Sequence, residues 1–216
     1  MDDASVIPFF TTLRAANPEP VTELEYASVF ELLVAVLLSA QATDRSVNKA
    51  TRRLFATAPT AARMLGIGEP AIEDAIRTIG LFRTKARNLH ATCRILVDKH
   101  DGQVPRTREA LEALPGVGRK TANVVLSNAF GDATLAVDTH VFRVANRTGL
   151  SLGRTPLEVE LGLLRRVPEE FLPNAHHWLI LHGRYVCLAR RPLCEQCAVA
   201  RWCDSAPLFL SGQTIA

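Results

Sequence analysis

The sequence has little of what marks a membrane, secreted or disordered protein. Its longest apolar run, Leu32–Leu38, is far shorter than the roughly 20 residues that cross a bilayer. The chain starts on an acidic segment and lacks the basic stretch that opens a signal peptide. It also contains no repeat, low-complexity tract or long linker. We therefore expect a protein that does not enter the membrane and stays in the cytoplasm, as in a prokaryotic cell.

The net charge of the chain is low, and cysteines are few. The 216 residues carry a formal net charge of +3, which permits an anionic partner without requiring one. The chain has 5 cysteines, and in a reducing compartment these serve as metal ligands or buried thiols more often than as disulfides. Because 48% of the residues are hydrophobic, the composition is that of a globular protein with one large domain or two small lobes.

The apolar residues that are present recur at helical spacing, and no alternating strand pattern is found, so we predict an all-α fold. The run around Phe30–Leu38 is apolar on nearly every side and predicts a central buried helix. Thr43 or Asp44 is expected to cap the next helix, and Thr155 with Glu158 spells a capping box. Further helices are expected near 70–79, 84–99, 107–113 and 119–130, with turns marked by glycines such as Gly66/Gly68.

Four of the cysteines fall in one short segment: Cys187, Cys194, Cys197 and Cys203. Four soft thiolates so close in sequence are typical of a metal centre. A structural zinc site usually shows two CxxC-like pairs, whereas only Cys194 and Cys197 form such a pair here. The wider outer spacing favours an iron–sulfur cluster only slightly over zinc, and a disulfide is the third alternative. Cys93 lies in a helical segment and is expected to be a buried thiol.

Basic residues accompany these cysteines. Arg190 and Arg191 stand between the first two, and the segment from Arg184 to Cys203 holds a single acidic residue, Glu195. The arginines are expected either to offset the negative charge of a cluster or to contact a phosphate backbone.

Residues 107–130 contain the segment LPGVGRKTA between two helical patterns. Proline and glycine allow a tight turn there, and Gly116 and Gly118 leave backbone N–H groups near the start of the second helix. Such groups bind phosphate oxygens regardless of base sequence. The segment resembles the helix-hairpin-helix motif of DNA-repair proteins.

Lys120 opens that second helix, and burial together with the positive end of a helix would favour a neutral, nucleophilic amine. A solvated lysine beside DNA phosphates is the alternative. Asp138, in the segment AVDTHVFRV, is a strong candidate for a helix N-cap, which alone would account for it.

Taken together, these motifs resemble the endonuclease III family of DNA glycosylases. The matching segments are ELLVAVLLSAQATD at 31–44, SVNKAT at 46–51, TIGLF at 78–82, LPGVGRKTANVVL at 114–126, AVDTHVFRV at 136–144 and HHWLILHGRYVC at 176–187, with the four cysteines. The resemblance implies two helical lobes with a DNA cleft between them. One is a six-helix lobe of residues 22–133 that includes the hairpin. The other joins residues 1–21 to 134–216 and carries a 4Fe–4S cluster in the loop 187–203.

The resemblance also implies the chemistry. Lys120 would attack the sugar as an oxidised pyrimidine leaves, with Asp138 as its catalytic carboxylate, and the Schiff base would lead to β-elimination 3′ to the abasic site. Gln41 would fill the space of the extruded base, and Leu81 would wedge into the opposite strand. On sequence alone, a polar residue at a helix end and a core leucine are the favoured interpretations of Gln41 and Leu81. The remaining DNA contacts would come from Gly116, Gly118, His140, Arg190 and Arg191.

The expected partner is double-stranded DNA with damaged bases or abasic sites, bound by a monomer. Related adenine glycosylases resemble PGVGRST at the hairpin and carry a further C-terminal domain, so Lys120 argues against a monofunctional mismatch glycosylase. A non-catalytic DNA-binding iron–sulfur module is the alternative from another class.

Overall fold

The computed structural model describes residues 1–211, and all regular elements in that range are helices, which confirms the all-α prediction. The chain divides into two compact units. One is continuous, Thr22–Asp132, and the other joins Met1–Val21 to Ala133–Ala216. Among residues 1–211 the search for a helix long and apolar enough to span a bilayer found none.

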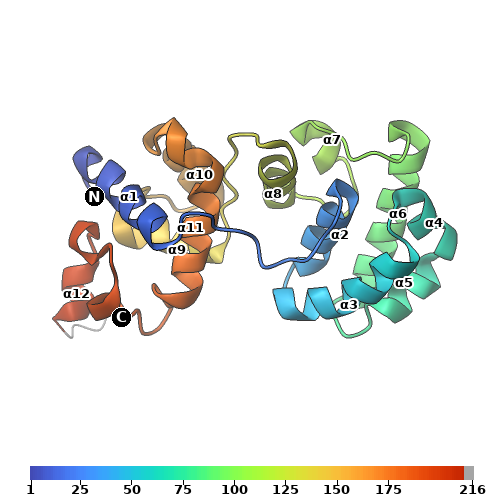
Figure 1. Cartoon of the computed structure of the whole chain (residues 1–216), viewed down its shortest axis with the longest axis horizontal. Coiled ribbons are helices and arrows are strands. Elements are labelled where there is room, and N and C mark those ends of the chain that lie inside the picture. The colour runs from blue at the N-terminus through green and yellow to red at the C-terminus, as the bar shows by residue number, and fades with distance from the viewer. Residues whose placement is uncertain (212–216) are drawn as a thin grey trace. The chain divides into compact units, whose positions relative to one another are not determined.

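The continuous unit is built around α2 and α6 (Figure 1). α2 packs against α3, α6 and α8, while α6 also packs against α4 and α5. Gly68 divides two short helices in this unit, so it holds seven helices where six were expected. They are α2 (Val29–Ser39), α3 (Asp44–Thr57), α4 (Ala61–Ile67), α5 (Glu69–Ala75), α6 (Phe82–His100), α7 (Arg108–Glu112) and α8 (Arg119–Phe130).

The burial of α2 follows from its composition. Ser28 caps the helix by accepting the N–H of Glu31, and every residue from Phe30 to Leu38 is buried. The predicted central helix is therefore confirmed. Either Thr43 or Asp44 was predicted to cap α3. The cap is Thr43, whose hydroxyl accepts the N–H of Ser46.

Two boundaries were predicted wrongly in the same region. Gly66 does not mark a turn, because α4 runs through it and ends at Ile67. The helix expected over 70–79 ends at Ala75, and the chain then turns with the N–H of Ile79 donating to the carbonyl of Ile76. Ile76 and Ile79 are both buried. They continue the apolar spacing of α5 into the turn, which is why the sequence pattern predicted a longer helix.

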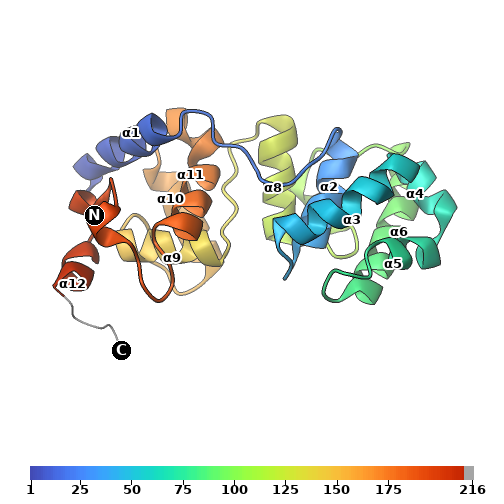
Figure 2. The ribbon, with the colours of Figure 1, turned by 60° about the horizontal axis from the view of Figure 1, so that its bottom comes forward.

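The discontinuous unit is visible in Figure 2 with α9, α10 and α11 together and α1 against α11. Its elements are η1 (Asp3–Ser5), α1 (Val6–Ala16), α9 (Thr139–Thr148), α10 (Pro156–Arg166), η2 (Glu169–Phe171), α11 (Leu172–Tyr185), η3 (Cys194–Gln196), η4 (Ala200–Trp202) and α12 (Ala206–Leu210). The predicted capping box of α10 is confirmed, with Thr155 and Glu158 each accepting from the other's backbone.

Aromatic side chains attach α1 to this unit. Phe10 stacks on Phe171 with ring centroids 5.4 Å apart, and Phe9 meets Phe10 edge-on at 5.3 Å. The indole Nε1 of Trp178 donates to the carbonyl of Asn17 at 2.8 Å. The first helix of the chain therefore belongs to a core whose other residues lie far along the sequence.

Candidate functional site

The hairpin between α7 and α8 has a turn that only glycine accommodates. Gly116 has φ +80°, and a Cβ on it would lie 2.9 Å from Nδ2 of Asn88 on α6. Thr92, also on α6, donates its hydroxyl to the carbonyl of Pro115 at 3.1 Å. The turn is therefore held against α6 by a close contact and by a hydrogen bond.

Gly118 is the N-cap of α8 and has extended backbone with φ −101°. It supplies no side-chain acceptor, and the first turn of α8 holds no acidic residue. Gly118 is exposed. The positive end of this helix therefore faces solvent, as the phosphate-binding prediction requires.

Lys120 is the second residue of α8 and its side chain is exposed. The sequence-based argument that burial would favour its neutral amine is therefore wrong. Its predicted position at the start of α8 is confirmed.

Gln41 and Leu81 are exposed residues in the left-handed region, with φ +53° and +59°. Gln41 follows the end of α2, and Leu81 is the N-cap of α6 with 61% of its surface exposed. A core role for Leu81 is thereby excluded. A left-handed conformation costs a non-glycine residue about 1–3 kcal/mol and is typical of functional positions.

Asp138 belongs to the discontinuous unit and caps α9. Its Oδ1 accepts the N–H groups of His140 and Val141, each at 2.8 Å. The capping prediction is confirmed, and the carboxylate is held at the positive end of the helix.

His140 is the second residue of α9 and is half-buried. Its Nδ1 is 3.3 Å from Nη2 of Arg143. Because a guanidinium only donates, Nδ1 is the acceptor. Arg143 also donates to the carbonyls of Gly183 at 2.7 Å and Cys187 at 2.9 Å. These bonds join α9 to the end of α11.

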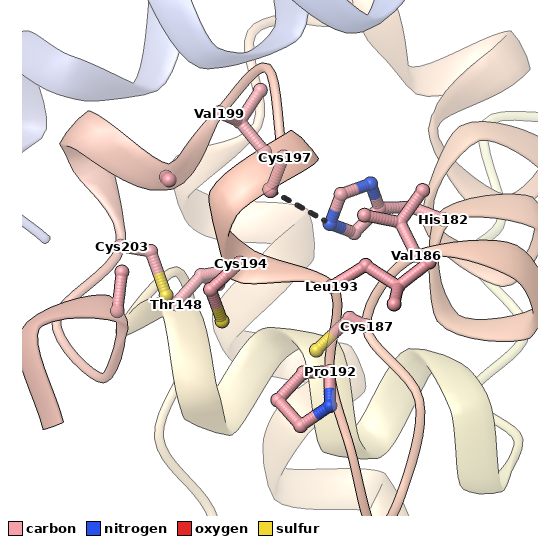
Figure 3. Close-up of a pocket in the computed structure, with 12 residues that line it drawn as sticks. Thr148, His182, Val186, Cys187, Pro192, Leu193, Cys194, Cys197, Val199 and Cys203 are labelled. Carbon is pink, nitrogen blue, oxygen red and sulfur yellow. Dashed lines mark hydrogen bonds between the residues drawn. The ribbon is translucent and has the colours of Figure 1, made fainter. Parts of the chain in front are cut away.

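The four predicted cysteines come together. Cys187, Cys194, Cys197 and Cys203 line a single pocket whose other walls include Val186, Leu193 and Val199 (Figure 3). Cys93, in contrast, is fully buried in the continuous unit, as predicted.

Burial, followed by the neighbouring Cys187, raises the pKa of the Cys194 thiol. Burial is also the largest cause that raises the pKa of Cys197 and Cys203. Without a bound cation, Cys194, Cys197 and Cys203 therefore disfavour the thiolate form. Within residues 1–211, no three histidine, cysteine or carboxylate side chains converge closely enough to hold a single metal ion.

Arg147, which lies beside this pocket and contacts Cys187, is a residue that the sequence analysis missed. It donates to the carbonyls of Leu188 at 2.7 Å and Ala189 at 2.6 Å, and its Nη1 lies 3.6 Å from Sγ of Cys187. Basic residues were considered in the sequence only between Arg184 and Cys203, so Arg147 was not included. The signal for Arg147 was its position four residues after Arg143, on the same side of α9.

Arg190 and Arg191 are exposed and directly follow the residues whose carbonyls Arg147 holds. They lie in a bend between the first two cysteines. This placement is compatible with both predicted roles, which are to offset the negative charge of a cluster and to contact a phosphate backbone.

Comparisons with known proteins agree over most of the chain. Residues 34–169 match the HhH-GPD superfamily of base excision DNA repair proteins. The proteins named endonuclease III from Haemophilus influenzae and Escherichia coli strain K12 are each 56% identical over 204 residues, 94% of this chain and 97% of each relative.

Solved structures show the same similarity. A non-covalent endonuclease III–DNA complex has a TM-score of 0.92 and 42% identity, covering 98% of this chain and 99% of that one. A trapped endonuclease III–DNA covalent intermediate has a TM-score of 0.91 at 42% identity and covers 97% and 99%. A thermostable thymine-DNA glycosylase at 24% identity shares the fold, with a TM-score of 0.79 and coverage of 95% and 94%.

Proposed function

The chain belongs to the endonuclease III family of the HhH-GPD superfamily of base excision DNA repair proteins, and from this membership we propose how its residues act. It is a DNA glycosylase and an abasic-site lyase. We propose that one amine, on Lys120, serves both activities. The observation that carries this proposal is a lysine at the second position of α8, directly after the uncapped glycine turn.

Lys120 Nζ donates its lone pair to C1′ of the damaged nucleotide, and the bond from C1′ to the base breaks with its electrons leaving on the base. Opening of the sugar ring then gives an imine between Nζ and C1′. The imine acidifies the C2′ proton, and its loss expels the 3′ phosphate. The strand is thereby cut by β-elimination.

Asp138 is the proposed carboxylate partner of this amine. It accepts a proton that the ammonium must lose before attack, and its negative charge stabilises positive charge that develops on the sugar. One oxygen is used to cap α9, so the helix orients the carboxylate.

The hairpin is proposed to bind DNA phosphates through the amides that follow Gly116 and Gly118. Gln41 fills the space left by the extruded base, and Leu81 separates bases of the opposite strand. Their exposure and left-handed backbones support this role. His140, Arg190 and Arg191 are proposed as further contacts to the DNA.

The four cysteines of the pocket are proposed to hold a 4Fe–4S cluster. The four thiols line one apolar pocket, and four cysteines are the usual ligands of such a cluster. Such a cluster would supply the positive charge that favours thiolates and would hold the loop that carries Arg190 and Arg191.

Chemical analysis tests this cofactor. About four irons and four acid-labile sulfides per chain are expected in anaerobically purified protein. Cys203→Ser is expected to lower both, whereas Cys93→Ser, in the core of the other unit, is expected to leave them unchanged. A stoichiometric zinc content with no sulfide would contradict the cluster.

The substrate class follows from the family as a proposal: oxidised or ring-saturated pyrimidines in double-stranded DNA. We further propose that the protein acts as a monomer in the cytoplasm of a prokaryotic cell.

Borohydride trapping tests the mechanism. The protein is incubated with a duplex that holds one thymine glycol, borohydride is added, and a covalent protein–DNA adduct is expected. Lys120→Gln is expected to form no adduct and to lose strand cleavage while still binding the duplex. Lys99→Gln, which changes an exposed lysine of α6, is the matched control and should be trapped normally. Base release without an adduct would indicate a monofunctional glycosylase, and binding without either product would indicate a non-catalytic module.

A further inference from the structure

Lys85, in the first turn of α6, is a buried lysine with 5% of its surface exposed. Its ammonium donates to the carbonyl of Leu38 at 2.9 Å, and burial lowers its pKa. Burying a charged group is unfavourable unless its surroundings compensate for it. A methionine would fill the same space without that cost, so packing alone does not account for a lysine here.

The acceptor of this bond lies at the end of α2. The last carbonyls of a helix have no partner within the helix and carry partial negative charge. Ser39 Oγ donates to Val36, and the N–H of Ala42 donates to Ser39. Lys85 adds a cation at Leu38, so it completes the helix end three residues before Gln41.

The same residue is tied to a second loop through its backbone. The N–H of Lys85 donates to the carbonyl of Leu81 at 3.0 Å, the N-cap of α6. The two loops also lie close together, since a Cβ built on Gly80 would be 3.7 Å from the carbonyl oxygen of Gln41. The amide bond is the regular bond that opens α6, so the ammonium of Lys85 connects the helix that begins at Leu81 to the end of α2.

We propose that Lys85 is a positioning residue that clamps the loop of Gln41 to the loop of Leu81. Gln41 and Leu81 are both exposed and have left-handed backbone. The clamp holds their side chains in the arrangement in which they enter DNA at a lesion. This inference rests on the proposed function, in which these two residues fill and wedge the duplex. Preorganisation of this kind lowers the cost of ordering the loops on binding.

Lys85→Met tests the clamp. The probe is a duplex with one tetrahydrofuran, a stable abasic-site analogue, opposite 2-aminopurine, compared with the same duplex undamaged. The variant is expected to bind the undamaged duplex within about twofold of the original protein but to lose about tenfold or more of its preference for the analogue. The rise in 2-aminopurine fluorescence on binding is expected to fall with it. A general loss of stability would not change this ratio among folded molecules.

Lys99→Met is the matched control, because it removes the same charge from an exposed position of α6. It is expected to retain both the preference and the fluorescence change. Should Lys85→Met fail to fold, Lys85→Gln replaces it, since a neutral amide is easier to bury but is too short for the same bond. A folded Lys85 variant with full preference and full fluorescence change overturns the clamp.

Leu81→Ala and Gln41→Ala separate this inference from the function on which it rests. If both keep the preference for the analogue, the insertion roles fail whatever Lys85 does. If they lose the preference while Lys85→Met keeps it, only the clamp fails.

Discussion

Asp138 combines two tasks that single substitutions can separate. Capping requires an oxygen that accepts the N–H groups of His140 and Val141. The proposed catalysis requires a negative charge. Asparagine caps helices about as well as aspartate but is neutral, so it keeps one task and removes the other.

Asp138→Asn is therefore expected to slow base release about 10²-fold or more in single-turnover assays while the unfolding temperature hardly changes. Asp138→Ala should lose about 0.5–2 kcal/mol of stability in addition. Thr155→Ala, which removes the cap of α10 in the same unit, is the control and should lose stability but not rate. A wild-type rate in Asp138→Asn would exclude the catalytic carboxylate.

How far single residues could be predicted depended on where their partners lie. The cap at Asp138 and the burial of Cys93 follow from neighbours in the same helix. Arg147 and Lys85 were not recognised, because their partners lie 40 and 47 residues away. The exposure of Lys120 was missed for a related reason: nothing local decides which face of α8 is covered.

Among the elements, the hairpin contains two glycines that the sequence does not distinguish but the backbone does. Gly116 has φ +80° and a neighbour 2.9 Å from its hypothetical Cβ. Gly118 has φ −101°, and nothing lies within 4 Å of its Cβ position. Only the first position is closed to a side chain.

Gly116→Ala is expected to lower the free energy of unfolding by about 1–3 kcal/mol, through backbone strain and displacement of Asn88. Gly118→Ala in the same turn should cost less, about 0.5 kcal/mol, because alanine only caps α8 less well than glycine. Urea unfolding of the two variants side by side measures the difference. Equal losses would show that the turn conformation is not what requires glycine.

The helices were predictable where burial and capping agreed. α2 is apolar on all sides with a serine cap, and α10 opens with a complete capping box. α4 was missed because Gly66 reads as a turn, although it lies inside the helix. α5 was extended too far because Ile76 and Ile79, buried in the following turn, continue its apolar spacing. Apolar period alone does not distinguish a helix from a buried turn.

For the whole molecule, the two units differ in how they depend on the chain. Thr22–Asp132 is continuous and has its own core. The other unit has a core that contains Phe9 and Phe10 from α1 together with Phe171 and Trp178. Composition showed no boundary between them, and the division was expected only from the family resemblance.

A fragment of residues 22–132 is therefore expected to fold alone, with a helical circular dichroism spectrum and cooperative urea unfolding. A fragment of residues 133–216 should not unfold cooperatively, because each missing phenylalanine of α1 removes about 3–5 kcal/mol from a net stability of about 5–15 kcal/mol. A peptide of residues 1–21 added in trans is expected to restore the transition. Cooperative unfolding of residues 133–216 alone would contradict this dependence.

The attachment of α1 also sets an order of events on the ribosome. Asn17 and Trp178, joined by a hydrogen bond in the folded unit, are 161 residues apart. At synthesis rates of about 5–20 residues per second, α1 emerges roughly 8–32 seconds before its partner does. During that interval Thr22–Asp132 obtains all the residues of its own core. Phe10, in contrast, has its ring partners Phe171 and Trp178 only at the end of the interval. The segment around Trp178 must then pack against α1, which was synthesised much earlier. Until then the apolar face of α1 is exposed, and we expect a chaperone to shield it.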